Sequence, residues 1–251
     1  MEQASSFVNG LLEKYSSKYT SDIVILLKEI SKWAAKTYEI KDCLQNLDIP
    51  KVRKQEPVML TSKENKTLMK YLRKKITPTK AGILLTMYTG LRIGELCALT
   101  WKEIDLEQKV LYVRKTLQRI YVKGWKRKTM VTATTPKTES SVREIPLPES
   151  IVKILKKIRS GKNTYLLSGS ESFIEPRTLS NRFKKILKDL ELTDVHFHSL
   201  RHNFATKCLQ SRFDIKTLTE ILGHSNAGVT MRIYVHTSLE QKRACMSLLK
   251  Y

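Results

Sequence analysis

The stretch "HSLRHNFAT" places a histidine and an arginine three residues apart, at His198 and Arg201. Residues at this spacing share one face of a helix, so we expect both side chains to point at one ligand. A guanidinium is a planar, permanently charged group that binds two phosphate oxygens at once, and an imidazole exchanges protons near neutral pH. The pair therefore suits phosphate chemistry, although an HxxR pair alone is weak evidence. His196 and His202 lie off this face, and we interpret them as structural or surface groups.

Residues of related chemical kinds stand at other places in the chain. Arg92 lies in "TGLRIGEL", just after a glycine expected to end a helix. Lys137 lies in "TTPKTESS", at the predicted tip of a hairpin, and His224 follows a helix-ending glycine in "ILGH". Tyr234 comes ten residues after His224, in a segment predicted to be helical. These residues could supply a nucleophile, proton-transfer groups and cations to a single reaction.

In their order, spacing and flanking residues, these positions resemble the fingerprint of the tyrosine recombinase (phage integrase) family. That fingerprint combines an arginine in "TGLRxxEL", a lysine on a β-hairpin, HxxR, an "LGH" histidine and a tyrosine nucleophile. The resemblance covers residues 59–236. It implies a catalytic site made of Arg92, Lys137, His198, Arg201, His224 and Tyr234.

The resemblance also implies a reaction that cuts and rejoins DNA strands. Tyr234 attacks the scissile phosphorus and becomes joined to the 3′-phosphate, while His198 accepts or hydrogen-bonds the phenolic proton. The two arginines and His224 stabilise the pentavalent transition state, and Lys137 protonates the leaving 5′-oxygen. Neither a Walker glycine loop nor a carboxylate cluster suited to Mg²⁺ is evident, so we expect no cofactor and no metal.

Glu95 follows Arg92 by three residues and is expected on the same helical face. In the family an acidic residue at this position supports the first arginine, which gives Glu95 a supporting role. The simpler alternative is an acid favoured near a helix N-terminus by the helix dipole. Both interpretations are compatible with each other.

The charge balance points to a polyanionic partner. The chain has 251 residues with 46 Lys or Arg against 24 acids, a formal charge of +22. Residues 109–144 hold ten Lys or Arg and two acids. A solvated surface is the usual explanation of one such run, but the total charge favours DNA contact. The expected DNA-binding residues are Arg114, Lys115, Arg119, Lys123, Lys126, Arg127, Lys128 and Arg143.

The apolar pattern predicts a mainly α protein with a small antiparallel β-sheet, an α+β fold. Three antiparallel strands are expected between residues 109 and 147, where Val, Ile, Thr and Tyr are frequent. The surrounding segments show helical spacing. Helices are predicted in residues 61–72, 79–90, 147–158, 175–190, 198–210 and 215–224.

Two prolines around a charged stretch, Pro50 and Pro57, predict a linker between two domains. Residues 1–57 are expected to form a partial or reduced helical core-binding domain that clamps DNA, together with the linker. Residues 58–251 are expected to form the catalytic domain with a C-terminal tail helix. The first unit is shorter than in typical members, so either it is reduced or the chain is a truncated piece.

The expected substrate is double-stranded DNA carrying attachment or crossover sites. The resemblance implies a homotetramer on two duplexes, an accessory excision factor, and a tail helix that packs either on its own domain or on a neighbouring protomer. A membrane-binding protein is disfavoured because no apolar run approaches the roughly 18 residues of a spanning helix. We therefore expect a cytoplasmic, nucleoid-associated protein.

Several functions remain open on the sequence. An integrase of a phage or conjugative element is favoured because "PKTESSVREIPL" and the basic hairpin resemble that branch. A dimer-resolving or inversion recombinase is an alternative within the family. A type IB topoisomerase shares the chemistry. A non-catalytic DNA-binding protein that reads DNA through the helix pair in residues 200–223 is the rival from another class.

Overall fold

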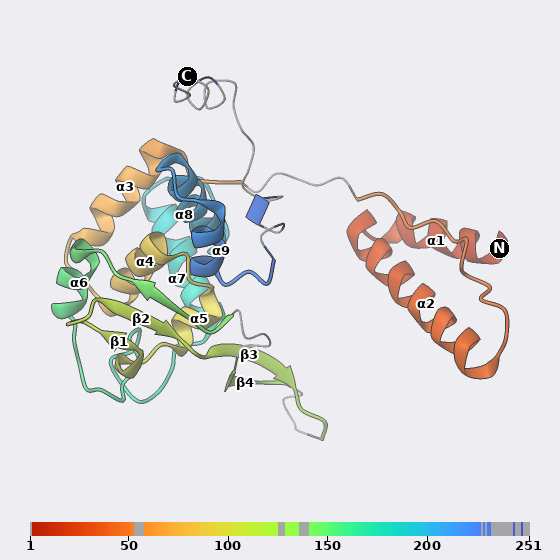
Figure 1. The fold of residues 1–251 in the computed structure, drawn as a ribbon, viewed down its shortest axis with the longest axis horizontal. Helices are drawn as coiled ribbons and strands as arrows, with labels where there is room; N and C mark the ends of the chain where they lie inside the picture. Colours follow the sequence, from red (N-terminus) through yellow and green to blue (C-terminus); the bar gives the residue numbers. More distant parts are fainter. Residues whose placement is uncertain are drawn as a thin grey trace. The chain divides into compact units, whose positions relative to one another are not determined.

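The computed structural model describes residues 2–52, 58–124, 129–135 and 141–226, together with residues 228, 230, 231, 243 and 247. The chain divides into two compact units, residues 1–57 and residues 58–251 (Figure 1). Lys126, Arg127, Lys128, Lys137, Tyr234 and the predicted tail helix lie outside the described residues, apart from two isolated positions of the tail. Among the described residues, none of the helices has the length and apolar character needed to cross a bilayer.

The first unit consists mainly of α1 (Glu2–Lys14) and α2 (Ser17–Tyr38). Ser16 caps α2 by accepting a hydrogen bond from the backbone N–H of Tyr19 at 3.3 Å. A small cluster of buried apolar residues joins the two helices to the segment that follows them: Val8, Val24 and Leu47. Most of the large apolar side chains of α1 and α2 are exposed, among them Phe7, Leu12, Ile25, Leu26, Ile30 and Trp33.

The second unit is built around a buried helix, α4 (Pro78–Thr89), whose residues 81–87 are all buried. This helix contacts α3 (Ser62–Arg73), α6 (Glu149–Lys156) and α8 (Ser199–Gln210). The predicted capping box at the start of α3 is present, with Thr61 and Glu64 bonded reciprocally. The other helices that the structure bounds in the described part of this unit are α5 (Ile93–Ala98), α7 (Pro176–Asp189), α9 (Ile215–Leu222) and the short 3₁₀ helix η1 (Trp101–Glu103).

The strands form two separate antiparallel sheets (Figure 1). The first has the order β1-β2-β5, and the second is a hairpin of β3 and β4 that projects from the rest of the second unit. In the first sheet Val113 lies opposite Arg143. The strand bounds are β1 (Ile104–Asp105), β2 (Val110–Val113), β3 (Thr116–Tyr121), β4 (Thr129–Thr134) and β5 (Arg143–Pro146).

The prediction of one three-stranded sheet is therefore wrong. The run expected to form the first strand is interrupted at Arg114 and Lys115, where the chain leaves β2 and starts the hairpin. The last predicted strand, β5, then pairs with β2 and not with β4. Hydrophobic alternation identifies strands but does not choose their partners, because each half of the run satisfies the same pattern.

A close approach of α5 to β3 fixes the base of the hairpin. A Cβ atom at Gly94 would lie 2.6 Å from Thr116 Oγ1 and 2.7 Å from the carbonyl oxygen of Leu117. Only glycine allows this contact between helix and strand. Because α5 starts directly after Arg92, the hairpin is packed against the element that carries the first candidate arginine.

Candidate active site

Arg92 lies at the N-cap of α5, where its guanidinium joins two segments distant in sequence. Nη1 donates to Oε1 of Glu95 at 2.7 Å, and Nη2 donates to the carbonyl oxygen of Gly223 at 3.0 Å. The backbone N–H of Arg92 donates to Oε2 of Glu95 at 2.9 Å. The arginine side chain is 37% exposed, whereas the glutamate is 3% exposed. Arg92 is thus supported from within the protein and still reaches solvent.

Arg201 is a buried arginine on the first turn of α8, only 1% exposed. Its Nη1 donates to the carbonyl oxygen of Gly90 at 2.8 Å, and its Nη2 donates to that of Leu222 at 2.6 Å. Gly90 ends α4 in the left-handed conformation and immediately precedes the segment of Arg92. Arg201 is therefore held by the ends of α4 and α9, and Arg92 is held by Glu95 and the end of α9. The shared end of α9 brings the two arginines into one site.

His198 lies at the N-cap of α8, one residue before the helix, and its ring packs edge-on against His202 at 4.7 Å between centroids. Although His198 keeps an exposed face, loss of hydration around the imidazole lowers its pKa to about 4. The positive charges of Arg201 and Arg92 act in the same direction. His198 is therefore neutral at neutral pH, with a ring nitrogen that can accept a hydrogen bond. His202 was expected to be structural or at the surface, and the structure places it beside His198, half-buried.

His224 follows the αL residue Gly223 at the end of α9. Its Nδ1 lies 2.8 Å from the hydroxyl of Thr230, and that hydroxyl lies 2.9 Å from the hydroxyl of Thr219. Burial and then the charge of Arg201 lower the pKa of His224 to about 4. The two threonines hold the ring through Nδ1, which directs Nε2 away from them. Thr230 is a site residue that sequence reasoning did not identify, since a threonine has no distinctive signature.

Glu95 was expected to support Arg92, and both of its carboxylate oxygens accept a bond from that residue. They also accept hydrogen bonds from Arg143: Nη1 donates to Oε1 at 3.0 Å, and Nη2 donates to Oε2 at 2.8 Å. Burial by itself would raise the pKa of Glu95, but the hydrogen bonds and charge of Arg143, with those of Arg92, lower it to about 2. The carboxylate is therefore ionised and fully paired.

The placement of Arg143 corrects the expectation that it belongs to a DNA-contacting surface. Its side chain is 5% exposed and engaged with Glu95. The physical reason is the alternation of β5, where Arg143 and Ile145 are buried and Glu144 between them is exposed. The sequence does contain this signal, because Arg143 falls in register with apolar residues of "VREIPL".

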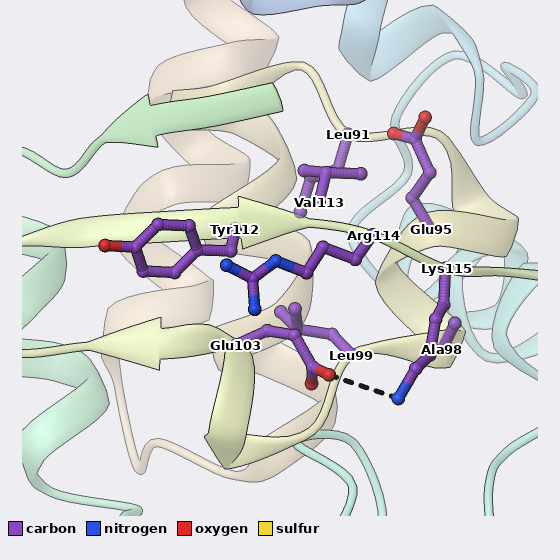
Figure 2. A pocket seen from close by; sticks show the side chains of 9 residues that line it. All are labelled: Leu91, Glu95, Ala98, Leu99, Glu103, Tyr112, Val113, Arg114 and Lys115. Carbon is purple, nitrogen blue, oxygen red and sulfur yellow. Dashed lines mark hydrogen bonds and ion pairs between the residues drawn. The ribbon is translucent and has the colours of Figure 1, made fainter. Parts of the chain in front are cut away.

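Four of the expected DNA-binding residues, Arg114, Lys115, Arg119 and Lys123, are exposed on or next to β2 and β3. Figure 2 shows Arg114 lying over the ring of Tyr112, at 4.7 Å, and Lys115 paired with Glu103, at 3.3 Å. Arg119 pairs with Glu175 at the start of α7, at 2.7 Å. These cations keep an exposed face, but three of them also have partners within the protein.

The site therefore gathers five of the seven predicted catalytic and supporting residues: Arg92, Glu95, His198, Arg201 and His224. The other two, Lys137 and Tyr234, lie outside the described residues. Within the part of the chain that the structure describes, there is no group of three or more His, Cys, Asp or Glu able to hold a metal ion. Two fixed guanidinium groups and two neutral imidazoles form a centre suited to a phosphate anion.

The second unit has the fold of the tyrosine recombinases. The sequence model described as the phage integrase family matches residues 58–241, and the chain belongs to that family. A XerC-like tyrosine recombinase of Caldanaerobacter subterraneus subsp. tengcongensis is 34% identical over 183 residues, which cover 65% of this chain and 46% of that protein. The ICEBs1 integrase of Bacillus subtilis is 29% identical over 161 residues, covering 59% of this chain and 42% of that protein. The chain thus spans about half the length of these relatives.

Solved structures show the same fold over nearly the whole chain. The Tn1549 transposon integrase in complex with circular intermediate DNA has a TM-score of 0.77 and 25% identity, covering 99% of this chain and 86% of that one. A lambda integrase tetramer bound to a Holliday junction has a TM-score of 0.65 and 18% identity, covering 93% and 64%. The predicted α+β recombinase fold is confirmed.

Proposed function

We propose that the protein is a site-specific DNA recombinase that cuts and rejoins strands through a covalent 3′-phosphotyrosine, and that it integrates or excises a mobile element. The observation that carries this proposal is the convergence of Arg92, Arg201, His198 and His224 at the adjoining ends of α4, α8 and α9. Family membership and the DNA complexes of the Tn1549 integrase support it.

In the proposed reaction the phenolic oxygen of Tyr234 attacks the scissile phosphorus, and the bond from phosphorus to the 5′-oxygen breaks. The phenolic proton passes to His198, which is neutral and can accept it. Lys137 gives a proton to the departing 5′-oxygen. The 5′-hydroxyl of another strand then gives its proton to Lys137 and attacks the phosphotyrosine. The bond from phosphorus to the tyrosine oxygen breaks, and Tyr234 regains its proton from His198. The phosphodiester is restored, so the bond energy is conserved and no ATP is consumed.

The charged phosphate oxygens are stabilised by groups that the fold has already oriented. Arg92 and Arg201 supply the permanent positive charge, and His224 adds a hydrogen bond through the nitrogen turned away from Thr230. Since these groups are held by backbone carbonyls and a buried carboxylate, little reorganisation accompanies the reaction.

Outside the catalytic centre, cations in and beside the hairpin contact the DNA backbone in this proposal. Arg114, Lys115, Arg119 and Lys123 are the described members of this set, and Lys126, Arg127 and Lys128 extend it. Such contacts give affinity without sequence specificity and make binding dependent on salt. Residues 1–57 act as a core-binding clamp, and residues 58–251 form the catalytic domain.

We also propose that the active assembly is a homotetramer on two duplexes, like the lambda integrase tetramer bound to a Holliday junction. The tail after residue 237 is proposed to pack on its own domain or on a neighbouring protomer, and an accessory excision factor would set direction. The protein would work in the cytoplasm, on the nucleoid.

A selection from random DNA tests the proposed function and finds the target sequence in the same experiment. The protein is incubated with a library of nicked DNA duplexes of random sequence, which traps cleaved strands, and DNA joined covalently to protein is recovered and sequenced. A recombinase yields an enriched inverted repeat and no covalent DNA with Tyr234→Phe. Binding without covalent DNA would indicate a DNA-binding protein. In a separate assay, relaxation of a supercoiled plasmid by the monomeric protein would indicate a topoisomerase.

A further inference from the structure

Arg143 is an extensively bonded arginine in the described part of the second unit. Three of its nitrogen atoms are donors: Nε binds the carbonyl oxygen of Ile221 at 2.6 Å, while Nη1 and Nη2 bind the two oxygens of Glu95. Nη1 also reaches the carbonyl oxygen of Ser141 at 3.1 Å. This side chain joins the first residue of β5 to both α5 and the end of α9.

The carboxyl end of α9 is held by three arginines in succession. The carbonyl oxygens of residues 221, 222 and 223 accept hydrogen bonds from Arg143, Arg201 and Arg92, in that order. A helix leaves its last carbonyls without partners inside the helix, and its dipole attracts cations there. The carbonyl oxygens of Thr219 and Glu220 accept hydrogen bonds from backbone N–H groups of the capping turn. The three guanidinium groups complete the end of the helix from which His224 projects.

Glu95 links Arg143 to Arg92 within this arrangement. Each carboxylate oxygen receives one bond from each arginine residue, Oε1 from the two Nη1 atoms and Oε2 from the Arg92 backbone N–H and Arg143 Nη2. Because Arg143 occupies the carboxylate as a two-pronged partner, Arg92 binds it with one guanidinium nitrogen only. The second nitrogen of Arg92 is then directed to Gly223.

We propose that Arg143 is a positioning residue for strand cleavage: it sets the orientation of Arg92 through Glu95 and the position of His224 through the end of α9. The proposal rests on the proposed function. Without Arg143 the buried carboxylate would draw the guanidinium of Arg92 into a two-pronged pair, away from the phosphate. The end of α9 would lose one of the three arginines that donate hydrogen bonds to its carbonyl oxygens. Lysine could not replace Arg143 fully, since it lacks the planar group that serves both oxygens.

The first test compares two substrates, using the duplex recovered by the selection described above. A methylphosphonate at the scissile position removes the negative charge that Arg92 neutralises. On the ordinary phosphate we expect Arg143→Met to slow covalent complex formation by about 100-fold, and Arg143→Lys by less. On the methylphosphonate we expect the loss caused by Arg143→Met to shrink to about tenfold or less. An equal loss on both substrates would mean that Arg143 does not act through Arg92.

The second test needs no activity and therefore separates this proposal from the proposed function. Hydrogen exchange of the full chain is followed by mass spectrometry on peptides spanning residues 215–226. Arg143→Met should speed exchange at the end of α9 and leave α7 unchanged. Arg143→Met leaves the charge of Glu95 buried and unpaired, which could cause misfolding. The double variant Arg143→Met with Glu95→Gln removes that charge, and it should show the same faster exchange at the end of α9. Glu144→Gln, on the exposed face of β5, is the matched control. Unchanged exchange at α9 in both variants would overturn the proposal, even if the enzyme is active.

Discussion

Arg201 donates a hydrogen bond through Nη1 to the carbonyl oxygen of Gly90, 111 residues earlier in the chain, at 2.8 Å. This bond ties the first turn of α8 to the end of α4, two residues before Arg92. The nearby side chains of Phe204 and Leu222 leave no room at Gly90, where a Cβ would lie 2.6 and 2.9 Å from their nearest atoms. Gly90 thus places Arg201, which bonds to its carbonyl oxygen, close to Arg92, which follows it by two residues.

Gly90→Ala should destabilise the second unit more than a strained backbone alone would. Gly90 has a φ of 66°, and the added methyl group would also collide with the core. We expect a loss of about 2–4 kcal/mol in the free energy of unfolding, measured by urea denaturation. Gly169→Ala is the matched control, since Gly169 has a φ of 68° with nothing within 4 Å of its added Cβ, and it should cost about 1 kcal/mol. Equal losses would show that packing at Gly90 is not tight.

Arg201→Ala should abolish strand cleavage while preserving most of the DNA affinity, because the proposed DNA-binding surface contains many other cations. It should also lower the free energy of unfolding by about 2–4 kcal/mol, since the buried carbonyls of Gly90 and Leu222 lose their donor. Covalent complex formation, filter binding and urea denaturation measure the three effects. Arg182→Ala removes an exposed arginine bonded to Thr79 and should change none of them greatly. A large loss of DNA affinity at moderate salt would contradict the assigned role.

Two active-site histidines should titrate well below the ordinary range in the DNA-free protein. The pKa values of His198 and His224 are both lowered to about 4, first by burial and then by neighbouring charges. A folded-state pKa below the unfolded value of 6.5 means that the neutral form stabilises the fold, an effect complete above pH 6.5 and lost as pH falls toward 4. NMR spectra of the imidazoles should therefore show both rings neutral at about pH 6. A midpoint near the ordinary histidine value for either ring would contradict this.

Removing a hairpin cation should weaken DNA binding in a salt-dependent way. Lys123 is exposed beyond the end of β3, and Lys123→Ala should reduce affinity for unrelated duplex sequences about equally. The slope of log affinity against log salt concentration should fall in magnitude by about one. Lys109→Ala is the comparison, because Lys109 pairs with Glu149 at 2.7 Å and its loss should alter the slope less. An unchanged slope for Lys123→Ala would remove the hairpin from the DNA interface.

The sequence predicted much of this arrangement, and its failures have physical causes. The helix start at Thr61, the helix ends at Gly90 and Gly223, and the α+β class follow from local signals that depend on neighbouring residues. The sheet was predicted wrongly because the pairing of β5 with β2 is a long-range choice. Charge alone predicts that Arg143 lies on the surface, whereas its position in the alternating strand indicates burial.

The sequence by itself determined which residue types are available for phosphate chemistry, and their order identified the family. Tertiary structure alone decided how they are held. The bonds from Arg92, Arg143 and Arg201 to three consecutive carbonyls of α9 join residues up to 131 positions apart, and no local pattern encodes such contacts. The same holds for Glu95, which is buried and ionised. Its low pKa depends on Arg143 in β5, a strand whose pairing partner the sequence did not predict. A buried charge or carbonyl without a hydrogen-bond partner costs free energy. The packing of the helices and strands therefore decides which groups pair, and the sequence does not reveal these pairs.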